Sequence, residues 1–219
     1  YLLIRVNFPE KKELEMRKVF IIGGGAAGMM AAIAAAYNGN EVHVFEKNEK
    51  NGKKLFITGK GRCNITNASD IENHFANIMR NSKFLYSAYH CLDSYGVCTI
   101  IESAGVETKI ERGNRVFPLS DKSSDVIYAL NKMMRDIGVN IHLKSEIVSV
   151  SKENENIILK EKNGKKHIGD ACIIATGGIS YPVTGSTGDG YKFAEKIGHT
   201  ITERYPSLVP FNIKEEFCK

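Results

Sequence analysis

The apolar positions of this chain fall into short runs separated by glycine-rich turns. Residues 19–22 form an apolar run that predicts a strand, the alanine-rich residues 26–37 predict a helix, and residues 41–45 predict a second strand. Two strands and a helix in this order form a βαβ unit, whose parallel strands are joined by a right-handed connection. Continuous apolar strands are typical of a parallel sheet that is covered on both faces.

The remaining elements follow from periodicity and turn signals. We expect helices over residues 71–95, over 124–137 with Ser123 as N-cap, and over 190–197 closed by Gly198. Short strands are expected at residues 106–109, 115–117, 141–143, 146–152, 157–162 and 171–175, with a hairpin turn at Asn163-Gly164 and an extended segment at 206–211. The pattern predicts an α/β fold with a central parallel sheet and an additional small β-sheet.

Composition narrows the class of protein. The 219 residues are 42% hydrophobic and 25% charged, which is enough apolar material for a sizeable core. No apolar run approaches the roughly 20 residues of a membrane span, and the N-terminus lacks the order of a signal peptide, so we expect a cytoplasmic protein. The net charge of +5 comes from cations interleaved with acids, which disfavours nucleic acid as a partner. Five cysteines without two-residue spacing argue against a disulfide framework, and we predict no metal site.

The segment Gly23-Gly24-Gly25-Ala26-Ala27-Gly28 fits a dinucleotide-binding turn, because it follows an apolar strand and opens a helix. Gly23 permits the tight turn, Gly25 lets the backbone approach a pyrophosphate, and Gly28 allows the helix to pack closely on the strand. The N-terminus of the helix offers unpaired N–H groups and the positive end of its dipole to the phosphates.

An acid stands where such a site binds ribose. Glu46 follows the second strand about 20 residues after the turn, where a carboxylate accepts hydrogen bonds from ribose hydroxyls and disfavours a 2′-phosphate. The nucleotide is therefore expected to be FAD or NAD rather than NADP.

Two later segments favour FAD. Residues 52–55 and 58–67 form a second cluster of glycines and cations, in which an arginine suits phosphate and the flanking glycines let the main chain lie against a flat ring. The strand 171–175 ends in Thr176-Gly177-Gly178, and a flexible turn at 185–190 leads to a helix with Asp189 as a plausible N-cap. A solvated basic loop is the alternative interpretation of the segment 58–67.

On these residues the sequence resembles the bacterial flavoproteins known as aminoacetone oxidase family FAD-binding enzymes, or BaiN-like NAD(P)/FAD-dependent oxidoreductases. The matching segments are 22–28, 59–67, 115–118, 120–122, 175–178, 180–182, 184–191, 198–199 and 206–210. The resemblance covers residues 16 to about 211, and the strings Gly-Arg-Cys-Asn-x-Thr-Asn and Pro-Ser-Leu-Val-Pro are its most specific parts.

The resemblance implies a Rossmann-like FAD-binding domain of the two-dinucleotide-binding type, with noncovalent FAD. It places Arg62, Cys63 and Asn64 along the cofactor and the backbone of Val148 at the adenine. Members of the family are about twice as long, so we expect residues 16–211 to be an incomplete FAD-binding domain and 212–219 to begin an inserted substrate domain. Residues 1–15, which precede Met16, are an extension of unclear status.

These arguments together predict a set of cofactor contacts. The predicted residues are Gly23, Gly25, Ala26, Ala27, Gly28, Glu46, Lys47, Lys54, Gly61, Arg62, Cys63, Asn64, Val148, Ala175, Thr176, Gly177, Gly178, Gly188 and Asp189.

The predicted function is that of an FAD-dependent oxidoreductase acting on a small molecule, reduced by NAD(P)H or directly by an amine or carbonyl substrate. The flavin carries the hard chemistry in such enzymes, and no residue stands out as the catalytic acid or base. A structural role is favoured for Cys63, a capping or packing role for His199, and Tyr181 either reaches the flavin or shapes its loop. Neither the substrate nor the oligomeric state follows from the sequence.

Three alternatives remain open at this point. A flavoprotein of the fumarate reductase or succinate dehydrogenase type would carry a histidine for covalent flavin attachment where this chain has Gly61 to Asn64. A flavoprotein of the tRNA-modifying type would bind RNA. A truncated chain would fold around the nucleotide without catalysing a reaction.

Overall fold

A four-stranded parallel sheet forms the centre of the protein. The computed structural model describes residues 15–206. The sheet has the order β10-β1-β2-β6 and consists of β1 (Lys18–Ile22), β2 (Glu41–Glu46), β6 (Asn140–Leu143) and β10 (Ala171–Ile174). All three pairings are parallel, with Ile22 opposite Phe45 on one side and Ile174 on the other. The predicted parallel sheet is confirmed.

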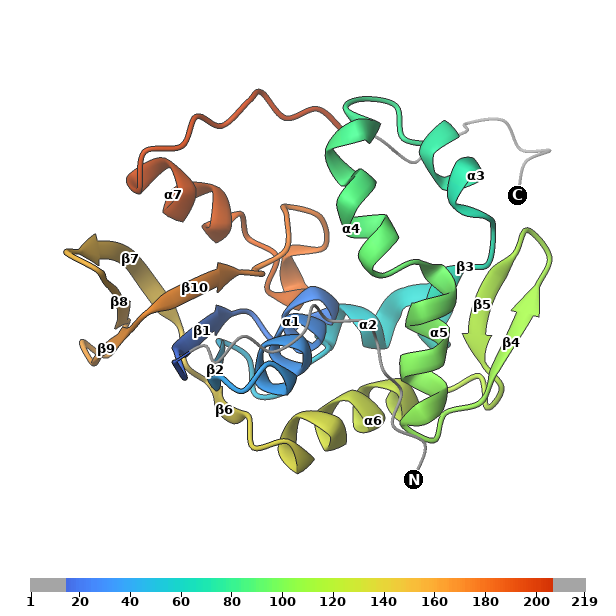
Figure 1. The fold of residues 1–219 in the computed structure, drawn as a ribbon, viewed down its shortest axis with the longest axis horizontal. Coiled ribbons are helices and arrows are strands. Elements are labelled where there is room, and N and C mark those ends of the chain that lie inside the picture. Colours follow the sequence, from blue (N-terminus) through green and yellow to red (C-terminus); the bar gives the residue numbers. More distant parts are fainter. Residues whose placement is uncertain (1–14, 207–219) are drawn as a thin grey trace, which may run out of the picture.

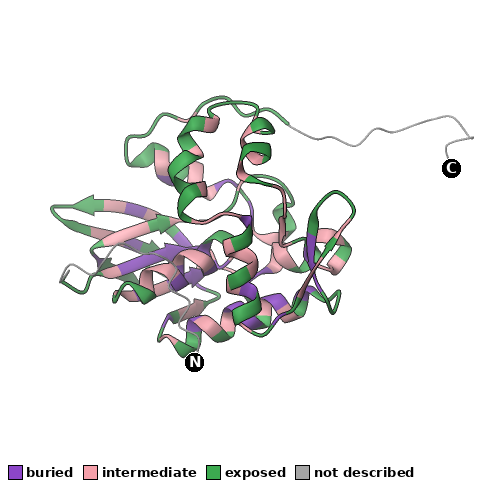
Figure 2. Ribbon diagram, turned by 45° about the vertical axis from the view of Figure 1, so that its right-hand side comes forward, coloured by how far each residue is buried: buried purple, intermediate pink, exposed green. Residues whose placement is uncertain are grey.

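Both faces of this sheet are buried, as the continuous apolar strands predict. Val19 and Ile21 point to one face and pack with Met29 and Met134, which lie on α1 (Ala26–Tyr37) and α6 (Ser123–Asp136). The alternate residues of β1 face the other side, where they join side chains of β7 (Ile147–Glu153), β8 (Asn156–Glu161) and α7 (Asp189–Lys196). Figure 2 shows the buried residues concentrated in the central strands. The period of two along each strand therefore supplies two separate apolar layers.

The turn between β1 and α1 depends on glycines at two positions. Gly23 has a φ of +107°, which side-chain-bearing residues rarely adopt. A Cβ on Gly28 would lie 1.8 Å from the carbonyl oxygen of Gly23, so only glycine lets the first turn of α1 sit on the end of β1. Both predicted roles are confirmed by this geometry.

Two small antiparallel sheets flank the centre, where the sequence predicted one. The first has the order β3-β5-β4, with β3 (Thr66–Asn67), β4 (Thr108–Glu111) and β5 (Arg115–Pro118). The second is a meander of β7, β8 and β9 (Lys166–Gly169), whose last turn contains Asn163 and Gly164 as predicted. In Figure 1 the β4–β5 hairpin and the β7–β9 meander stand at opposite sides of the molecule.

The predicted single helix over residues 71–95 is wrong, because this segment is broken. It contains α3 (Ile71–Ala76), the 3-10 turn η2 (Ser82–Leu85) and α4 (Tyr86–Cys91), and α5 (Ser94–Ser103) begins after a break. Asn81 has a φ of +55°, which interrupts the helix, and the Asp93 carboxylate accepts the Gly96 N–H at 2.7 Å and starts a new one. An apolar stripe does not reveal such internal caps.

Two predicted helix caps are also wrong. Ser123 is the first residue of α6, and its hydroxyl donates to the Phe56 carbonyl instead of capping the helix. Asp189 lies within α7, after Gly188, and its carboxylate binds Lys47 and Thr187. In both cases a long-range partner competes with the local backbone for the side chain.

The last predicted segment and the lengths of the helices complete the description of the fold. The predicted extended segment 206–211 lies beyond the described residues from position 207 onward. Within residues 15–206, every helix is too short or too polar to cross a membrane.

Candidate functional site

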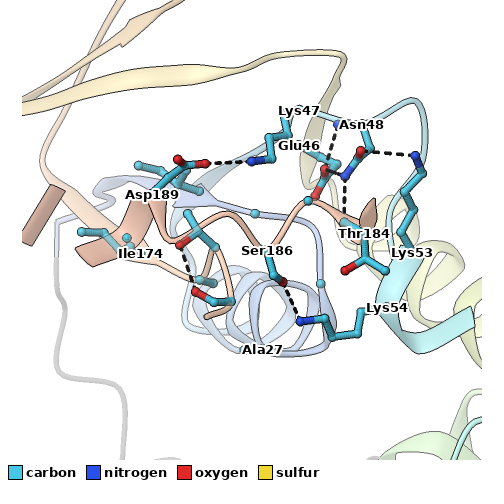
Figure 3. A pocket seen from close by; sticks show the side chains of 18 of the residues that line it. Ala27, Glu46, Lys47, Asn48, Lys53, Lys54, Ile174, Thr184, Ser186 and Asp189 are labelled. Atoms are coloured by element: carbon cyan, nitrogen blue, oxygen red, sulfur yellow. Dashed lines mark hydrogen bonds and ion pairs between the residues drawn. The ribbon is translucent and has the colours of Figure 1, made fainter. Parts of the chain in front are cut away.

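A cavity of about 700 Å³ opens at the carboxyl ends of β1, β2 and β10. Ligands bind at this edge in open parallel sheets, because the loops after the strands diverge there. The phosphate-type turn after β1, the segment after β2 with α2 (Lys53–Ile57), and the segment between β10 and α7 supply most of its walls. Figure 3 shows their side chains around the cavity.

The turn after β1 offers main chain rather than side chains to the cavity. Gly25, Ala26 and Ala27 line it, and a Cβ built on Gly25 meets no protein atom within 4 Å. The N-cap of α1 is Gly25 itself, with no side chain that bonds the first turn of the helix. The free N–H groups and the positive end of the helix dipole therefore face the cavity, which suits a pyrophosphate.

The carboxylate of Glu46 is held by the protein's own donors. It is buried, its Oε2 accepts the Gly24 N–H at 2.7 Å, and its Oε1 accepts the backbone N–H of Asn48 at 2.8 Å and the Asn48 side chain at 2.6 Å. Glu46 thus locks the phosphate-type turn to the end of β2, a role that the sequence did not indicate. Each carboxylate oxygen has more than one acceptor site, so these bonds are compatible with an additional ribose hydroxyl.

Three side chains tie the segment 179–189, which we call the strap, to the opposite wall (Figure 3). The Lys47 ammonium pairs with the Asp189 carboxylate at 2.7 Å, and the Asn48 amide donates to the Thr184 carbonyl at 3.3 Å. The Lys54 ammonium donates to the Ser186 hydroxyl at 2.6 Å and to the Ser180 carbonyl at 2.9 Å. The strap is therefore fastened across the cavity from one end to the other.

The charges around the cavity are predominantly positive. Lys47, Lys53 and Lys54 line it, against Glu46 and Asp189. Burial by itself would raise the pKa of Asp189, but hydrogen bonds from Lys47 and Thr187 outweigh it and lower the pKa, so this carboxyl is ionised. Burial lowers the pKa of Lys54, whose partners are neutral oxygens. Lys54 therefore has a positive charge that no carboxylate in residues 15–206 pairs with, which suits an anionic ligand.

The structure brings twelve of the predicted contact residues together in the cavity wall. They are Gly23, Gly25, Ala26, Ala27, Glu46, Lys47, Lys54, Ala175, Thr176, Gly177, Gly178 and Asp189. Gly28 lies directly behind the wall, against Gly23, and Gly188 precedes α7. Val148 lies beside Ile147, a lining residue, and is the extra residue of a bulge in the β7–β8 register, so its backbone lacks a ladder partner there.

Four predicted contact residues lie outside the lining of the cavity that residues 15–206 form: Gly61, Arg62, Cys63 and Asn64. The Arg62 guanidinium lies 4.0 Å above the Phe117 ring and pairs with Glu111 at 2.8 Å and with Asp121 at 3.3 Å. Hydrogen bonding to Glu111 raises the pKa of Arg62, and the same bond lowers that of Glu111. A contact between these four residues and the cofactor stays a prediction.

Three further residues were considered for a role at the flavin, namely Cys63, Tyr181 and His199. Cys63 is fully buried and burial raises the pKa of its thiol, which agrees with the predicted structural role. Tyr181 is 65% exposed, with a φ of +54°, and precedes the 3-10 turn η3 (Pro182–Thr184). The exposed His199 donates its backbone N–H to Ala194 at the end of α7.

Sequence reasoning missed a group of lining residues. They include Asn48, Thr58, Ser145, Ile147, Thr184, Ser186, Tyr191 and Phe193. Ser186 lies in the flexible turn 185–190 and Thr184 in the matching segment 184–191, and both segments were usable signals. Ser145 lies in the loop between β6 and β7, and Ile147 is the first residue of β7. Only the pairing of β6 with β2 brings these residues to the cavity.

Comparison with known proteins identifies the family. Residues 17–204 match the HI0933-like protein Rossmann domain. The chain is 34% identical over 206 residues to the 3-dehydro-bile acid delta(4,6)-reductase of Clostridium scindens, covering 91% of this chain and 48% of that protein. It is 30% identical over 200 residues to the ribosomal RNA dihydrouridine synthase of Escherichia coli strain K12, covering 91% of this chain and 49% of that protein. The chain spans about half the length of these curated relatives.

Solved flavoprotein structures share the fold. An open conformation of a flavocytochrome c3 fumarate reductase aligns with a TM-score of 0.56 at 22% identity, covering 85% of this chain and 41% of that one. The 3-ketosteroid-delta4-(5alpha)-dehydrogenase of Rhodococcus jostii RHA1 aligns with a TM-score of 0.54 at 15% identity, covering 76% of this chain and 47% of that one.

The open cradle at Gly25, the acid after β2 and the cationic walls fit FAD, and the family match agrees with them. The resemblance found in the sequence is therefore confirmed, and the chain belongs to the FAD-binding family described by the HI0933-like protein Rossmann domain.

Proposed function

We propose that the whole protein is an oxidoreductase that holds FAD noncovalently in the cavity at the end of the parallel sheet. The observation that carries this proposal is the open main-chain cradle at Gly25, where a Cβ would project into empty space at the N-terminus of α1. A pyrophosphate is the group that such a cradle suits best, because N–H groups and the helix dipole both favour an anion there.

Different residues would contact different parts of the cofactor. Gly25, Ala26 and Ala27 hold the pyrophosphate, and Glu46 accepts from the ribose while it fixes the turn. The loop between β6 and β7 and the bulge at Val148 in β7 face the adenine end. Lys54 supplies a positive charge beside the strap.

Bound FAD accepts a hydride and passes electrons on, and the protein determines what reaches it. The strap residues Ser180 and Ser186, held by Lys54, limit access to the cavity on one side. We propose NAD(P)H, or an amine or carbonyl substrate, as the source of electrons. The small-molecule reductase among the relatives supports a low-molecular-weight substrate.

The test is a visible absorption spectrum of the purified whole protein, followed by mass analysis of the cofactor released by acid. We expect the two absorption bands of a flavin and a released mass equal to that of FAD. A colourless preparation that releases NAD would overturn the proposal. A flavin that stays with the denatured protein on a gel would instead show covalent attachment, as in the alternative of the fumarate reductase type.

A second candidate function is action on RNA. It is favoured by the match to a ribosomal RNA dihydrouridine synthase at 30% identity. RNA binding that weakens steeply between low and moderate salt would support it, because cationic contacts to phosphates release counterions. Reduced flavin that RNA does not reoxidise would favour the small-molecule function.

A further inference from the structure

A second hollow lies outside the FAD cavity, between α2, α6 and the edge strand β6. We call it the α6 groove, and its volume is about 760 Å³, within the range of pockets that bind small molecules. Figure 1 shows α6 running below the central sheet, with α2 and β6 beside it. The FAD site does not use this groove, and the sequence motifs did not point to it.

The α6 groove is apolar over much of its wall. Its inner side is formed by Ile127, Ile141 and the buried Val139. Phe56, Tyr128 and Leu143 stand around it with 48%, 65% and 44% of their surfaces exposed. Large apolar side chains that gather around a hollow mark a place where an apolar body gains by leaving water.

The charges around the α6 groove are cations only. Lys50 and Arg135 line it, and its lining contains no aspartate or glutamate among residues 15–206. Within that described part of the chain, neither cation takes part in an ion pair, and the Lys50 ammonium lies 4.9 Å from the centre of the Phe56 ring. Two cations without carboxylate partners beside an apolar wall complement an anion that carries an apolar body.

A fixed pair of amides separates the α6 groove from the FAD cavity. The Asn51 side chain, 4% exposed, donates to the Asn131 oxygen at 2.8 Å, and Asn131 donates to the Ile127 carbonyl at 2.8 Å. Asn51 also abuts the back of the phosphate-type turn, since a Cβ on Gly24 would lie 2.0 Å from its oxygen. The two sites are therefore neighbours that share no lining residue.

We propose that the α6 groove binds an amphipathic organic anion, with a ring-containing apolar body and one carboxylate, sulfonate or phosphate group. The apolar body packs against Phe56, Tyr128 and Leu143, and the anionic group is held by Lys50 and Arg135. This proposal is independent of the oxidoreductase function, because none of these side chains lines the FAD cavity.

The test measures the affinity of two dyes for the whole protein saturated with FAD. The first is 8-anilino-1-naphthalenesulfonate, and the second is N-phenyl-1-naphthylamine, which has the same rings without the sulfonate. We expect the anionic dye to bind at one site per chain and about tenfold more tightly than the neutral dye, which corresponds to ~1.4 kcal/mol.

A double variant, Lys50→Gln with Arg135→Gln, removes both cations. Its affinity for the anionic dye is expected to fall about tenfold while that for the neutral dye stays the same. The matched control is Lys132→Gln, which removes a cation of the same helix that pairs with Asp136 and does not line the groove. Equal loss in the control and the double variant would overturn the proposal, since a general charge effect would then explain the binding.

A separate variant tests the location. Leu143→Glu places an acid in the groove at a side chain that is already 44% exposed, so the fold tolerates it, and binding of both dyes is expected to fall at least tenfold. Anionic dye binding that persists in this variant, or that FAD displaces competitively, would place the dye elsewhere and overturn the proposal. The same holds if the wild-type groove is covered by a second copy, shown by self-association that Leu143→Glu abolishes.

Discussion

Two segments that contain glycines, residues 23–28 and residues 59–64, have opposite surroundings in this protein. Residues 23–28 follow a buried parallel strand and turn their main chain toward the cavity, with Gly25 open to it. Residues 59–64 follow a short helix and lead into an antiparallel sheet. Lys60 and Cys63 adopt φ values of +59° and +63°, and Arg62 is engaged with Glu111 and Asp121.

This difference teaches that glycine and cation content does not by itself make a phosphate site. In the first segment the sheet edge and the helix dipole orient free N–H groups. In the second, η1 (Thr58–Gly61) bends the chain so that its arginine lies on Phe117 between two acids. The first segment has free N–H groups that can bind an anion, whereas the arginine of the second segment is already paired with two acids of the protein.

The largest effect is expected from a change behind the first segment. Gly28→Ala places a Cβ 1.8 Å from the Gly23 carbonyl oxygen, so α1 must move away from β1. We expect the free energy of unfolding to fall by about 3 kcal/mol, as for overpacked cores. Urea denaturation of the protein without cofactor measures it. A variant as stable as the parent would show that α1 is not held as closely as the geometry indicates.

Gly25→Val sharpens the comparison, because it alters the cavity and leaves the packing intact. Its backbone φ of −79° suits valine, and no protein atom lies within 4 Å of the new Cβ. We expect FAD affinity to fall at least about 100-fold, or ~2.7 kcal/mol, with the stability of the cofactor-free protein unchanged. Flavin retention through gel filtration reports the FAD affinity, and thermal unfolding reports the stability of the cofactor-free protein. If the variant purifies as yellow as the parent, the pyrophosphate does not bind at Gly25.

An intermediate effect is expected where Glu46 fastens the first segment. Glu46→Gln places an NH₂ group among three N–H donors and leaves one buried donor unpaired. We expect a loss of about 1 to 3 kcal/mol in unfolding free energy, and weaker FAD binding in addition. The control is Glu49→Gln, an exposed acid three residues away, for which no comparable loss is expected. Equal losses in both variants would mean that the buried hydrogen bonds contribute nothing specific.

The smallest effect on stability is expected in the second segment. Arg62→Gln removes partly exposed ion pairs, which contribute little and are screened by salt. Arg62 lowers the pKa of Glu111 by a hydrogen bond, and Lys109 together with Arg62 lowers that of Asp121. Their stabilisation is therefore present above the ordinary values of 4.5 and 3.8 and is lost as the pH falls below them. The variant should lose less stability than the parent on acidification.

Thermal unfolding of parent and variant at pH 7 and at pH 3.5, in low and high salt, checks this expectation. A large loss of FAD affinity in Arg62→Gln with unchanged stability would break the comparison. It would show that the second segment binds the cofactor directly, as the family resemblance implies.

Much of the first segment was predictable because its requirements are local. Residue type alone indicates each of its features. Glycine at position 23 permits a positive φ, glycine at 25 and 28 provides a position without a Cβ, and an acid stands at the end of β2. The strand order could be inferred in part, since apolar runs and a short crossover leave few topologies. The break in the helix after residue 71 was missed, because the positive φ of Asn81 and the cap at Asp93 lie within an apolar stripe that looks continuous.

The sequence by itself determined the nucleotide-binding turn, the parallel sheet and the resemblance to a flavoprotein family, because backbone conformation and burial period depend on neighbouring residues. Only the tertiary structure decided which side chains meet across the cavity. Lys47 pairs with Asp189, which is 142 positions away, and Arg62 pairs with Glu111, which is 49 positions away. Such pairs form because separate strands end at one edge or pack on one sheet, and no local pattern encodes that meeting.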